Sequence, residues 1–162
     1  LIPRRTSVLV KKELFRVPLL SRAMRMGSLV PVDRSNRESA VASLRAARTV
    51  LKAGINMTIF IEGTRSYDGR LLPFKKGPFY LAEESGVPIV PVTISGSQAV
   101  LPKNKVAVRP GTITVHFHAP VNPAAYADRD ALMAAVRKEI DSALPPELRE
   151  GPGNAERQSG VE

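Results

Sequence analysis

The chain has 162 residues, 43% hydrophobic and 24% charged, a composition typical of one globular domain with a buried core. Its 24 Lys and Arg outnumber 15 Asp and Glu, and the net charge of +9 favours anionic partners: nucleic acid, phosphorylated metabolites or an acidic membrane surface. The sequence has no cysteine, which excludes disulfides and a thiol nucleophile, and no apolar run approaches the roughly 20 residues of a membrane span.

The first elements predicted along the chain are two short strands separated by a helix. Apolar runs predict strands at Ser7–Val10 and Leu29–Val32. Between them, Pro18–Met26 is predicted to be a helix with interleaved arginines, and Gly27 is suited to end it. No signal peptide is recognisable, and residue 1 is Leu rather than Met, so we expect the natural N-terminus to lie upstream.

A longer helix and a strand are predicted next. Ser35 or Asn36 can cap the helix, and Gly54 ends it. Its apolar positions repeat at helical spacing and form one face: Val41, Leu44, Ala47 and Leu51. The continuous apolar run Met57–Ile61 then has the length of a strand, and we expect it to be a central strand buried on both sides.

The second half continues the alternation of helices and strands. Lys76–Ser85 is predicted to be a helix that ends at Gly86, and Pro88–Ile94 a buried strand. Thr112–His118 alternates apolar with polar residues, which is typical of a half-exposed strand near a sheet edge.

A last helix closes the predicted domain. Asp128 is suited to cap it, and its inward positions are Leu132, Val136, Ile140 and Leu144. From Pro145 the chain is polar and rich in Pro and Gly, so we expect a domain over residues 1–144 and a flexible tail over 145–162. The pattern predicts an α/β fold with a mostly parallel or mixed central sheet flanked by helices.

Polar clusters follow two of the predicted strands, at the ends where ligands gather in α/β sheets. Arg34 ends the stretch Pro-Val-Asp-Arg, and Arg65 ends Glu-Gly-Thr-Arg. Each guanidinium can fork onto a phosphate, and Gly63 lets the backbone approach a ligand closely. Lys75 and Lys76 add point charges a short loop away. Together these residues favour a site for a phosphate-bearing substrate over a solvated surface turn.

Three stretches, GSLVPVDRSN, FIEGTRSYDGRLLPFKKGPFYLA and VPIVPVTISGS, resemble successive sequence blocks of the glycerolipid acyltransferases. The resemblance is closest to the bacterial 1-acyl-glycerol-3-phosphate acyltransferases and covers residues 7 to 97 in the family's order. It implies a glycerol-3-phosphate acyltransferase-like fold and a role in phospholipid biosynthesis, without metal or other cofactor. The implied reaction moves a fatty acyl group from acyl-CoA or acyl carrier protein to the hydroxyl of lysophosphatidic acid, giving phosphatidic acid.

The resemblance also implies roles for individual residues. Arg34 and Arg65 would bind the acceptor's phosphate, and Lys11 would be a further contact. The pocket around that phosphate would be shaped by Glu62, Gly63 and Thr64. Further pocket positions would be Lys75, Lys76, Gly77 and, at the acyl or active-site wall, Pro91.

One part of the family's pattern is missing. The first block of the family is a His followed by four residues and an Asp, which supply the general base and orient it. The two histidines here, His116 and His118, are followed at the fifth position by Val121 and Pro123, and we expect both on the open face of an edge strand. The general-base His is therefore expected upstream of Leu1, with no catalytic residue in this chain.

Other functions would also explain parts of the sequence. A nucleic-acid-binding module would explain the charge, but only 5% of residues are aromatic and none is Trp, so stacking surfaces are scarce and we expect no nucleic-acid partner. The Gly-rich nucleotide-binding motifs are absent, although a basic phosphate-binding α/β module stays open. So does an acyltransferase with another lyso-lipid acceptor, such as a lyso-ornithine lipid.

The lipid substrates imply a place at the cytoplasmic side of a membrane, with the protein either peripheral or anchored by upstream segments. The arginine-rich helix Pro18–Met26 could lie on an anionic membrane surface. An ordinary helix with its apolar face on the sheet explains the same pattern equally well.

Overall fold

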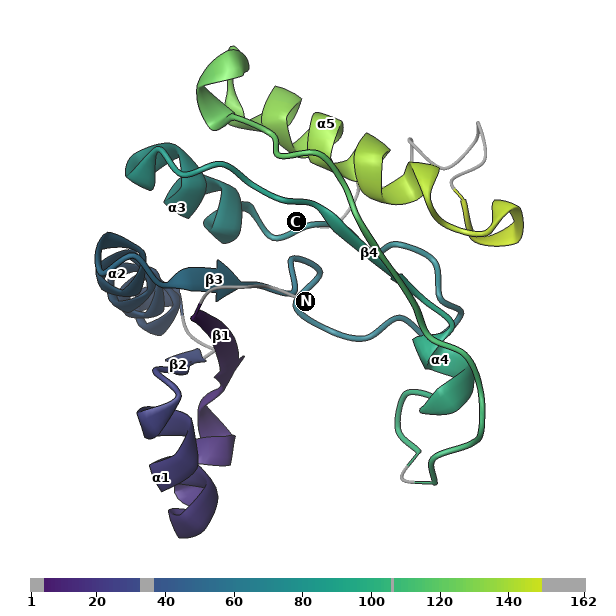
Figure 1. The fold of residues 1–162 in the computed structure, drawn as a ribbon, viewed down its shortest axis with the longest axis horizontal. Helices are drawn as coiled ribbons and strands as arrows, with labels where there is room; N and C mark the ends of the chain where they lie inside the picture. Colours follow the sequence, from purple (N-terminus) through teal and green to yellow (C-terminus); the bar gives the residue numbers. More distant parts are fainter. Residues whose placement is uncertain (1–4, 33–36, 106, 150–162) are drawn as a thin grey trace. The chain divides into compact units, whose positions relative to one another are not determined.

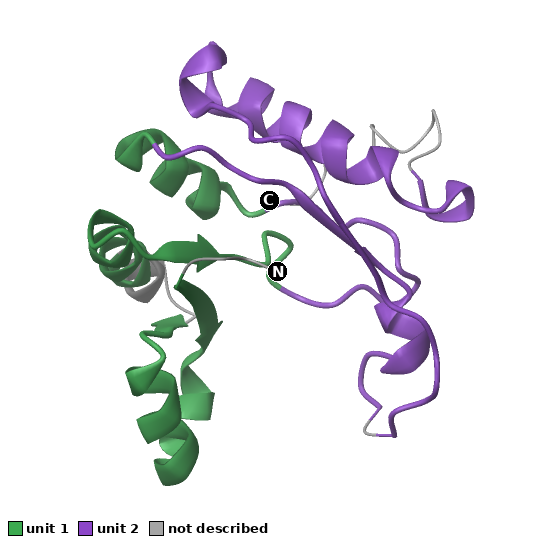
Figure 2. Cartoon of the chain, viewed as in Figure 1, with its two compact units in different colours: residues 1–63, 75–86 green, residues 64–74, 87–162 purple. Residues whose placement is uncertain are grey.

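A computed structural model describes residues 5–32, 37–105 and 107–149 (Figure 1). The chain divides into two compact units (Figure 2). Unit 1 comprises Leu1–Gly63 and Lys75–Gly86, and unit 2 comprises Thr64–Phe74 and Val87–Glu162. Within the described ranges, no helix is both long and apolar enough to cross a membrane.

Unit 1 is built on a three-stranded parallel sheet. The strand β1, Thr6–Lys11, lies at its centre, between β2, Val30–Val32, and β3, Asn56–Thr58. Leu9 pairs with Val30 in the register of β1 and β2. Because all three strands run in the same direction, their carboxyl ends lie at one edge of the sheet.

Helices flank this sheet, as the sequence predicts. The 3-10 helix η1, Lys12–Arg16, leads into α1, Pro18–Met26, whose bounds match the predicted helix. The longer α2, Arg37–Lys52, packs on β2 and β3 and on α3. Its proposed caps, Ser35 and Asn36, lie outside the described residues. The core of the unit is formed by Leu9, Val30, Ala47 and Leu81, with Val32, Leu44, Val50, Leu51, Met57 and Ile59 packed against it.

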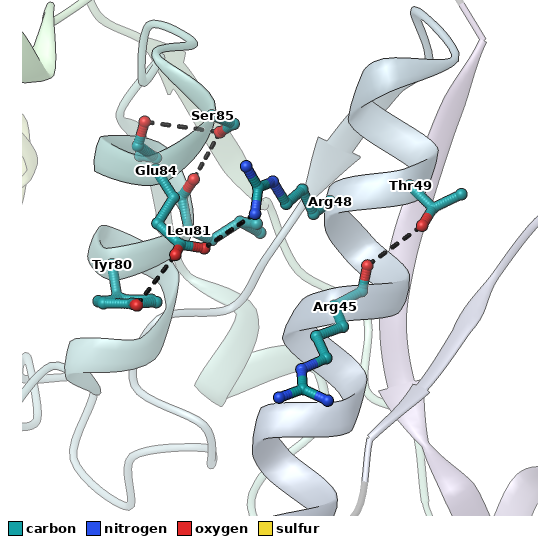
Figure 3. Close-up of polar contacts among 8 residues, drawn as sticks. Arg45, Arg48, Thr49, Tyr80, Leu81, Glu84 and Ser85 are labelled. Carbon is teal, nitrogen blue, oxygen red and sulfur yellow. Dashed lines mark hydrogen bonds and ion pairs between the residues drawn. The ribbon is translucent and has the colours of Figure 1, made fainter.

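The helix α3, Lys76–Ser85, also has its predicted bounds and ends on Gly86, which adopts the left-handed conformation at φ 65°. Polar contacts join α3 to α2 (Figure 3). Arg48 Nη1 lies 3.8 Å from Glu84 Oε2, and Tyr80 Oη donates to Glu84 Oε1 at 2.9 Å. The carboxylate of Glu84 therefore accepts from its own helix and pairs with a cation of the neighbouring one.

The prediction for Met57–Ile61 is wrong in two respects. β3 ends at Thr58, and it is an edge strand of the described sheet rather than the central one. The chain leaves the sheet early because it turns at Phe60, whose carbonyl oxygen accepts from Gly63 N at 3.0 Å, and the Phe60 side chain is 60% exposed. An apolar run of strand length thus includes residues that lead into a turn.

Unit 2 combines an antiparallel pair of strands with a helix. β4, Val92–Ser95, pairs with β5, Thr114–Phe117, and the short helix α4, Ser97–Val100, follows β4. The 3-10 helix η2, Pro123–Ala125, precedes α5, Arg129–Ser142. The predicted cap of α5 is confirmed, since the Asp128 side chain accepts from Ala131 N at 2.8 Å. So are its inward positions: Leu132, Val136, Ile140 and, just after the helix, Leu144 are buried.

The predicted strand Pro88–Ile94 is longer and more buried than the observed one. Before β4 the chain makes an isolated bridge between Ile89 and Val121 instead of a regular ladder, and Val90 and Ile94 are exposed. Prolines at 88 and 91 lack the N–H group that a ladder needs, so regular pairing begins only after them. The α/β class is confirmed, but the described strands form a parallel sheet and a separate antiparallel pair.

The beginning of the predicted tail is ordered. The 3-10 helix η3, Pro146–Leu148, is followed by Arg149, whose side chain donates to the carbonyl oxygens of Leu144 at 2.8 Å and Ser142 at 2.9 Å. These bonds satisfy acceptors at the C-terminus of α5. The flexible tail remains a prediction for residues 150–162, which lie outside the described part.

Candidate functional site

The turn that follows β3 is the centre of the candidate site in unit 1. Gly63 has φ +71°, a conformation that L-residues with a side chain rarely adopt. Lys75 N donates to the carbonyl oxygen of Ile61 at 2.8 Å, so the intervening loop starts and ends at neighbouring positions. The loop therefore returns the chain to the same edge of the sheet, where α3 begins.

Two of the expected site residues meet at this turn. A Cβ atom on Gly63 would lie 3.4 Å from Lys75 Cγ and 3.5 Å from Lys75 Cε, so the lysine side chain runs along the glycine backbone. Lys75 precedes the first residue of α3, Lys76, and both lysines are exposed. The positive end of a helix dipole and two ammonium groups at one turn attract anions.

Gly77 lies in the first turn of α3, close to α2. A Cβ atom on this glycine would lie 3.4 Å from Leu44 Cδ1 of α2, at van der Waals contact. Glu62 is half-buried within unit 1, beside Gly63 in the sequence. The expected place of Gly77 in the pocket remains a prediction.

Lys11 lies at the same edge of the parallel sheet. It is the last residue of β1 and pairs in register with Val32, the last residue of β2. Its side chain is 64% exposed, and its Nζ lies 3.9 Å from Glu13 Oε2. An ion pair this exposed contributes little to stability, so the ammonium group stays accessible to an anion. Arg34, two residues beyond β2, lies outside the described residues.

Thr64 and Arg65 begin the part of the loop that belongs to unit 2, and both side chains are exposed. The residues after them form a compact turn. Asp68 Oδ1 accepts from Ser66 Oγ at 2.7 Å and from Arg70 N at 3.0 Å. The hydrogen bond from Ser66, followed by that from the Arg70 backbone, holds the pKa of Asp68 below its ordinary value.

An arginine that the sequence analysis missed fixes the far end of this loop. Arg137 of α5 donates to the carbonyl oxygens of Leu72 at 2.9 Å and Leu71 at 3.4 Å, and its guanidinium lies 4.9 Å from the centre of the Phe74 ring. Its position in a regular helical pattern gives no sign of this contact. Arg137 therefore attaches the loop that carries Arg65 to the longest helix of unit 2.

His118 contradicts the expectation of an open strand face. Its side chain is only 5% exposed, with Nε2 2.8 Å from Thr93 Oγ1 and Nδ1 3.5 Å from Glu139 Oε2. Thr93 Oγ1 in turn donates to the carbonyl oxygen of Ile140 at 2.7 Å. Because that hydroxyl gives its hydrogen to Ile140, it accepts from His118 Nε2–H, and Nε2 has no lone pair left for a substrate.

All four residues of β5 are exposed, on its polar as on its apolar face, and the buried imidazole of His118 follows directly after the strand. Alternation identifies two faces but does not say which of them is covered. Pro91 is buried near this network, and its carbonyl oxygen accepts from His118 N at 3.0 Å. Its expected role at an acyl or active-site wall remains a prediction.

Comparison with known proteins gives a consistent family assignment. Residues 1–95 match the protein family described as Acyltransferase. The chain is 41% identical over 122 residues to a 1-acyl-sn-glycerol-3-phosphate acyltransferase from Cocos nucifera, covering 75% of this chain and 40% of the relative. It is 39% identical over 126 residues to one from Saccharomyces cerevisiae, covering 75% of this chain and 41% of the relative. The chain thus spans less than half the length of these relatives.

A solved structure shares the fold. The crystal structure of the 1-acyl-sn-glycerophosphate (LPA) acyltransferase PlsC from Thermotoga maritima matches with a TM-score of 0.72 and 31% sequence identity. The match covers 84% of this chain and 54% of that chain. The similarity therefore extends beyond the matched sequence blocks into the second half of the chain.

Proposed function

Since this chain belongs to the acyltransferase family, we propose that it is the acceptor-binding part of a 1-acyl-sn-glycerol-3-phosphate acyltransferase. The enzyme would move a fatty acyl group from a thioester of coenzyme A or acyl carrier protein to the free hydroxyl of lysophosphatidic acid, giving phosphatidic acid. Relatives about 40% identical carry that activity in their names, which supports the acceptor and the donor class.

The observation that carries the proposal is the turn at Gly63. A residue with φ +71°, the Lys75 side chain along its backbone and the start of α3 occur together at the carboxyl edge of a parallel sheet. Such an arrangement suits a phosphate group, because backbone and ammonium donors can approach it from several directions. The family resemblance also implies that the forked guanidinium of Arg65 binds the acceptor's phosphate.

Anchoring the phosphate would position the hydroxyl for reaction. A general base removes the hydroxyl proton while the oxygen attacks the thioester carbonyl carbon, and the resulting tetrahedral intermediate expels the thiolate, which is then protonated. The cationic groups at the turn would take no part in these bond changes. Their contribution would be orientation, which lowers the entropy cost of bringing the acceptor to the thioester.

The general base is proposed to come from outside residues 1–162. His118 Nε2 lies 2.8 Å from Thr93 Oγ1 and its Nδ1 lies 3.5 Å from Glu139 Oε2, and the His116 ring packs against it at 4.6 Å between centroids. Both histidines belong to unit 2, and the described residues of unit 1, which carries the Gly63 turn, include none. We propose that the His and Asp of the family's first block supply the base and orient it.

A paired assay tests this assignment. Thioester-dependent acylation of lysophosphatidic acid is measured with residues 1–162 and with the same chain preceded by its natural upstream sequence. We expect turnover only in the longer protein, because a general base contributes roughly 10²–10⁴-fold. Turnover by residues 1–162 that is lost in His116→Ala would place the base in this chain. No acylation of lysophosphatidic acid by either protein, with acylation of another lyso-lipid, would replace the proposed acceptor.

The place of action also belongs to the proposal. Acceptor and product are both lipids, so the enzyme would work at a membrane, on the cytoplasmic side where the thioester donors are found. Attachment would be peripheral or through segments upstream of this chain.

A further inference from the structure

The segment from the end of β1 to the end of α1 leaves large apolar side chains in solvent. We call it the η1–α1 surface, residues 11–26 of unit 1. Leu19 is 83% exposed and Met26 77% exposed, and Leu14, Val17 and Leu20 are also exposed. Most of the helix is uncovered: within it only Ser21 and Met24 are buried.

The exposed residues of α1 are sorted by type around the helix. At about 100° per residue, Met26, Leu19, Ala23 and Leu20 follow one another on one side of the axis. Arg22 and Arg25 lie on the side next to Met26, away from Leu20. The helix therefore has a buried face, an exposed apolar face and an exposed basic face.

The η1–α1 surface is predominantly positive. Five basic residues stand against a single acid, Glu13, in this order: Lys11, Lys12, Arg16, Arg22 and Arg25. Glu13 pairs with Lys11 at 3.9 Å, so it does not neutralise the arginines of α1. An apolar face bordered by arginines matches the layering of an anionic bilayer, in which acyl chains lie beneath negative headgroups.

We infer that the η1–α1 surface docks the enzyme on an anionic phospholipid bilayer. Leu19 and Met26 enter the boundary between headgroups and acyl chains, and the arginine stems extend from the helix so that their guanidinium groups contact lipid phosphates. The helix lies along the surface and does not cross it. The purpose of this docking rests on the proposed function, because a lipid acceptor must be taken from a membrane.

Vesicle flotation measures docking without any acyl transfer. The chain is mixed with vesicles of phosphatidylcholine, with or without phosphatidylglycerol, and we expect binding only to the anionic vesicles, decreasing as salt is raised. Arg22→Gln with Arg25→Gln should weaken binding about twentyfold, since each charge near an anionic surface contributes a factor of about five. Leu19→Gln with Met26→Gln should weaken it about tenfold or more, because the apolar insertion is lost.

The matched control removes two charges elsewhere in unit 1. Arg45 and Lys52 are exposed residues of α2, so Arg45→Gln with Lys52→Gln makes the same change in net charge. Binding by this variant should stay within about threefold of the parent. These exposed sites should leave the folded state intact, which circular dichroism checks for all three variants.

Three outcomes would overturn the inference. An equal loss in the α2 control would mean that net charge alone attracts the protein. Binding unaffected by Leu19→Gln with Met26→Gln would mean that another face meets the lipid. A change of the chain from dimer to monomer in that variant would assign the apolar face to a second copy. Acylation of detergent-dispersed lysophosphatidic acid is measured in parallel with the same variants in the protein that includes its natural upstream sequence, so failure of docking and failure of the proposed activity are told apart.

Discussion

Polar side chains gather in two regions of this protein, and the two are organised differently. At the Gly63 turn, the exposed Lys75 side chain runs along a backbone held at a positive φ, and the exposed Lys76 follows it in the sequence. In unit 2, Thr93 is 2% exposed and the His118 side chain 5% exposed, and each has hydrogen-bond partners within the protein.

The difference in burial separates polar residues that stabilise the fold from polar residues that the fold does not need. A buried hydroxyl or imidazole costs free energy unless it is hydrogen-bonded, so the Thr93–His118 network is explained by its own burial. Exposed lysines need no partner, but a glycine in the left-handed region with a lysine along its backbone is a specific local structure. The proposed phosphate ligand would account for this local structure.

The largest expected effect concerns Arg65, which is proposed to bind the acceptor's phosphate. In the natural full-length enzyme, Arg65→Ala should lower kcat/KM for lysophosphatidic acid about ten- to a hundredfold, because a charged hydrogen bond contributes roughly 1.5–3 kcal/mol. Arg65→Lys should restore only part of it, since the fork is lost. The control is Arg109→Ala, an exposed arginine of the same unit, whose kinetics should match the parent. Equal kinetics in Arg65→Ala would remove this residue from the site.

Thr93→Val tests the buried network, where we expect a loss of stability rather than of activity. The substitution keeps the shape but leaves His118 Nε2 and the Ile140 carbonyl without their partner, so unfolding free energy should fall by about 1–3 kcal/mol. Denaturant unfolding measures this, and Thr114→Val on the exposed side of β5 should change stability by less than about 0.5 kcal/mol. Activity of the folded fraction should be unchanged. A specific loss of kcat in Thr93→Val would make the network part of the catalytic machinery.

The sequence predicted the helices better than the strands, for a physical reason. The bounds of α1 and α3 are determined locally, by Pro18 as the first residue of one and Gly86 after the other. Strand length depends on which distant segment pairs, so Met57–Ile61 was predicted as a long central strand although only Asn56–Thr58 pairs. Local patterns contain no information about that partner.

The same limit applies to the candidate site. The Gly63 turn was predictable because a positive φ and a strand end leave local signs in the sequence. His118 was predicted to be open because its partners, Thr93 and Glu139, are 25 and 21 residues away and alternation does not identify the covered face. Arg137 was missed likewise, since its acceptors lie 65 and 66 residues earlier in the chain.

A comparison of Gly63 with Gly54 separates acceptor binding at the turn from the strain of a left-handed backbone. Gly63 and Gly54 have φ of +71° and +73°, but a Cβ atom on Gly54 would meet nothing within 4 Å. Changing either to Ala should cost about 1–2 kcal/mol of stability through the left-handed backbone. Only Gly63→Ala should also raise KM for lysophosphatidic acid, by about tenfold, because its methyl group, in contact with Lys75, would obstruct the approach of the phosphate to the backbone. Equal KM values in the two variants would show that the Gly63 turn does not contact the acceptor.

The smallest effect concerns Asp68. Its carboxylate accepts hydrogen bonds from residues of the same loop that carries Arg65. The hydrogen bond from Ser66 lowers the pKa of Asp68 in the folded protein. Because the folded pKa lies below the unfolded one, the stabilisation is present above the unfolded pKa and is lost as pH falls through the folded pKa. An NMR titration of the carboxyl should show this low pKa, and Ser66→Ala should raise it toward the ordinary value, whereas Ser142→Ala should not change it. An unchanged Asp68 pKa in Ser66→Ala would mean that the Arg70 backbone N–H alone holds the carboxylate. The loop would then owe its shape, and the direction in which it presents Arg65, to backbone contacts rather than to this pair of side chains.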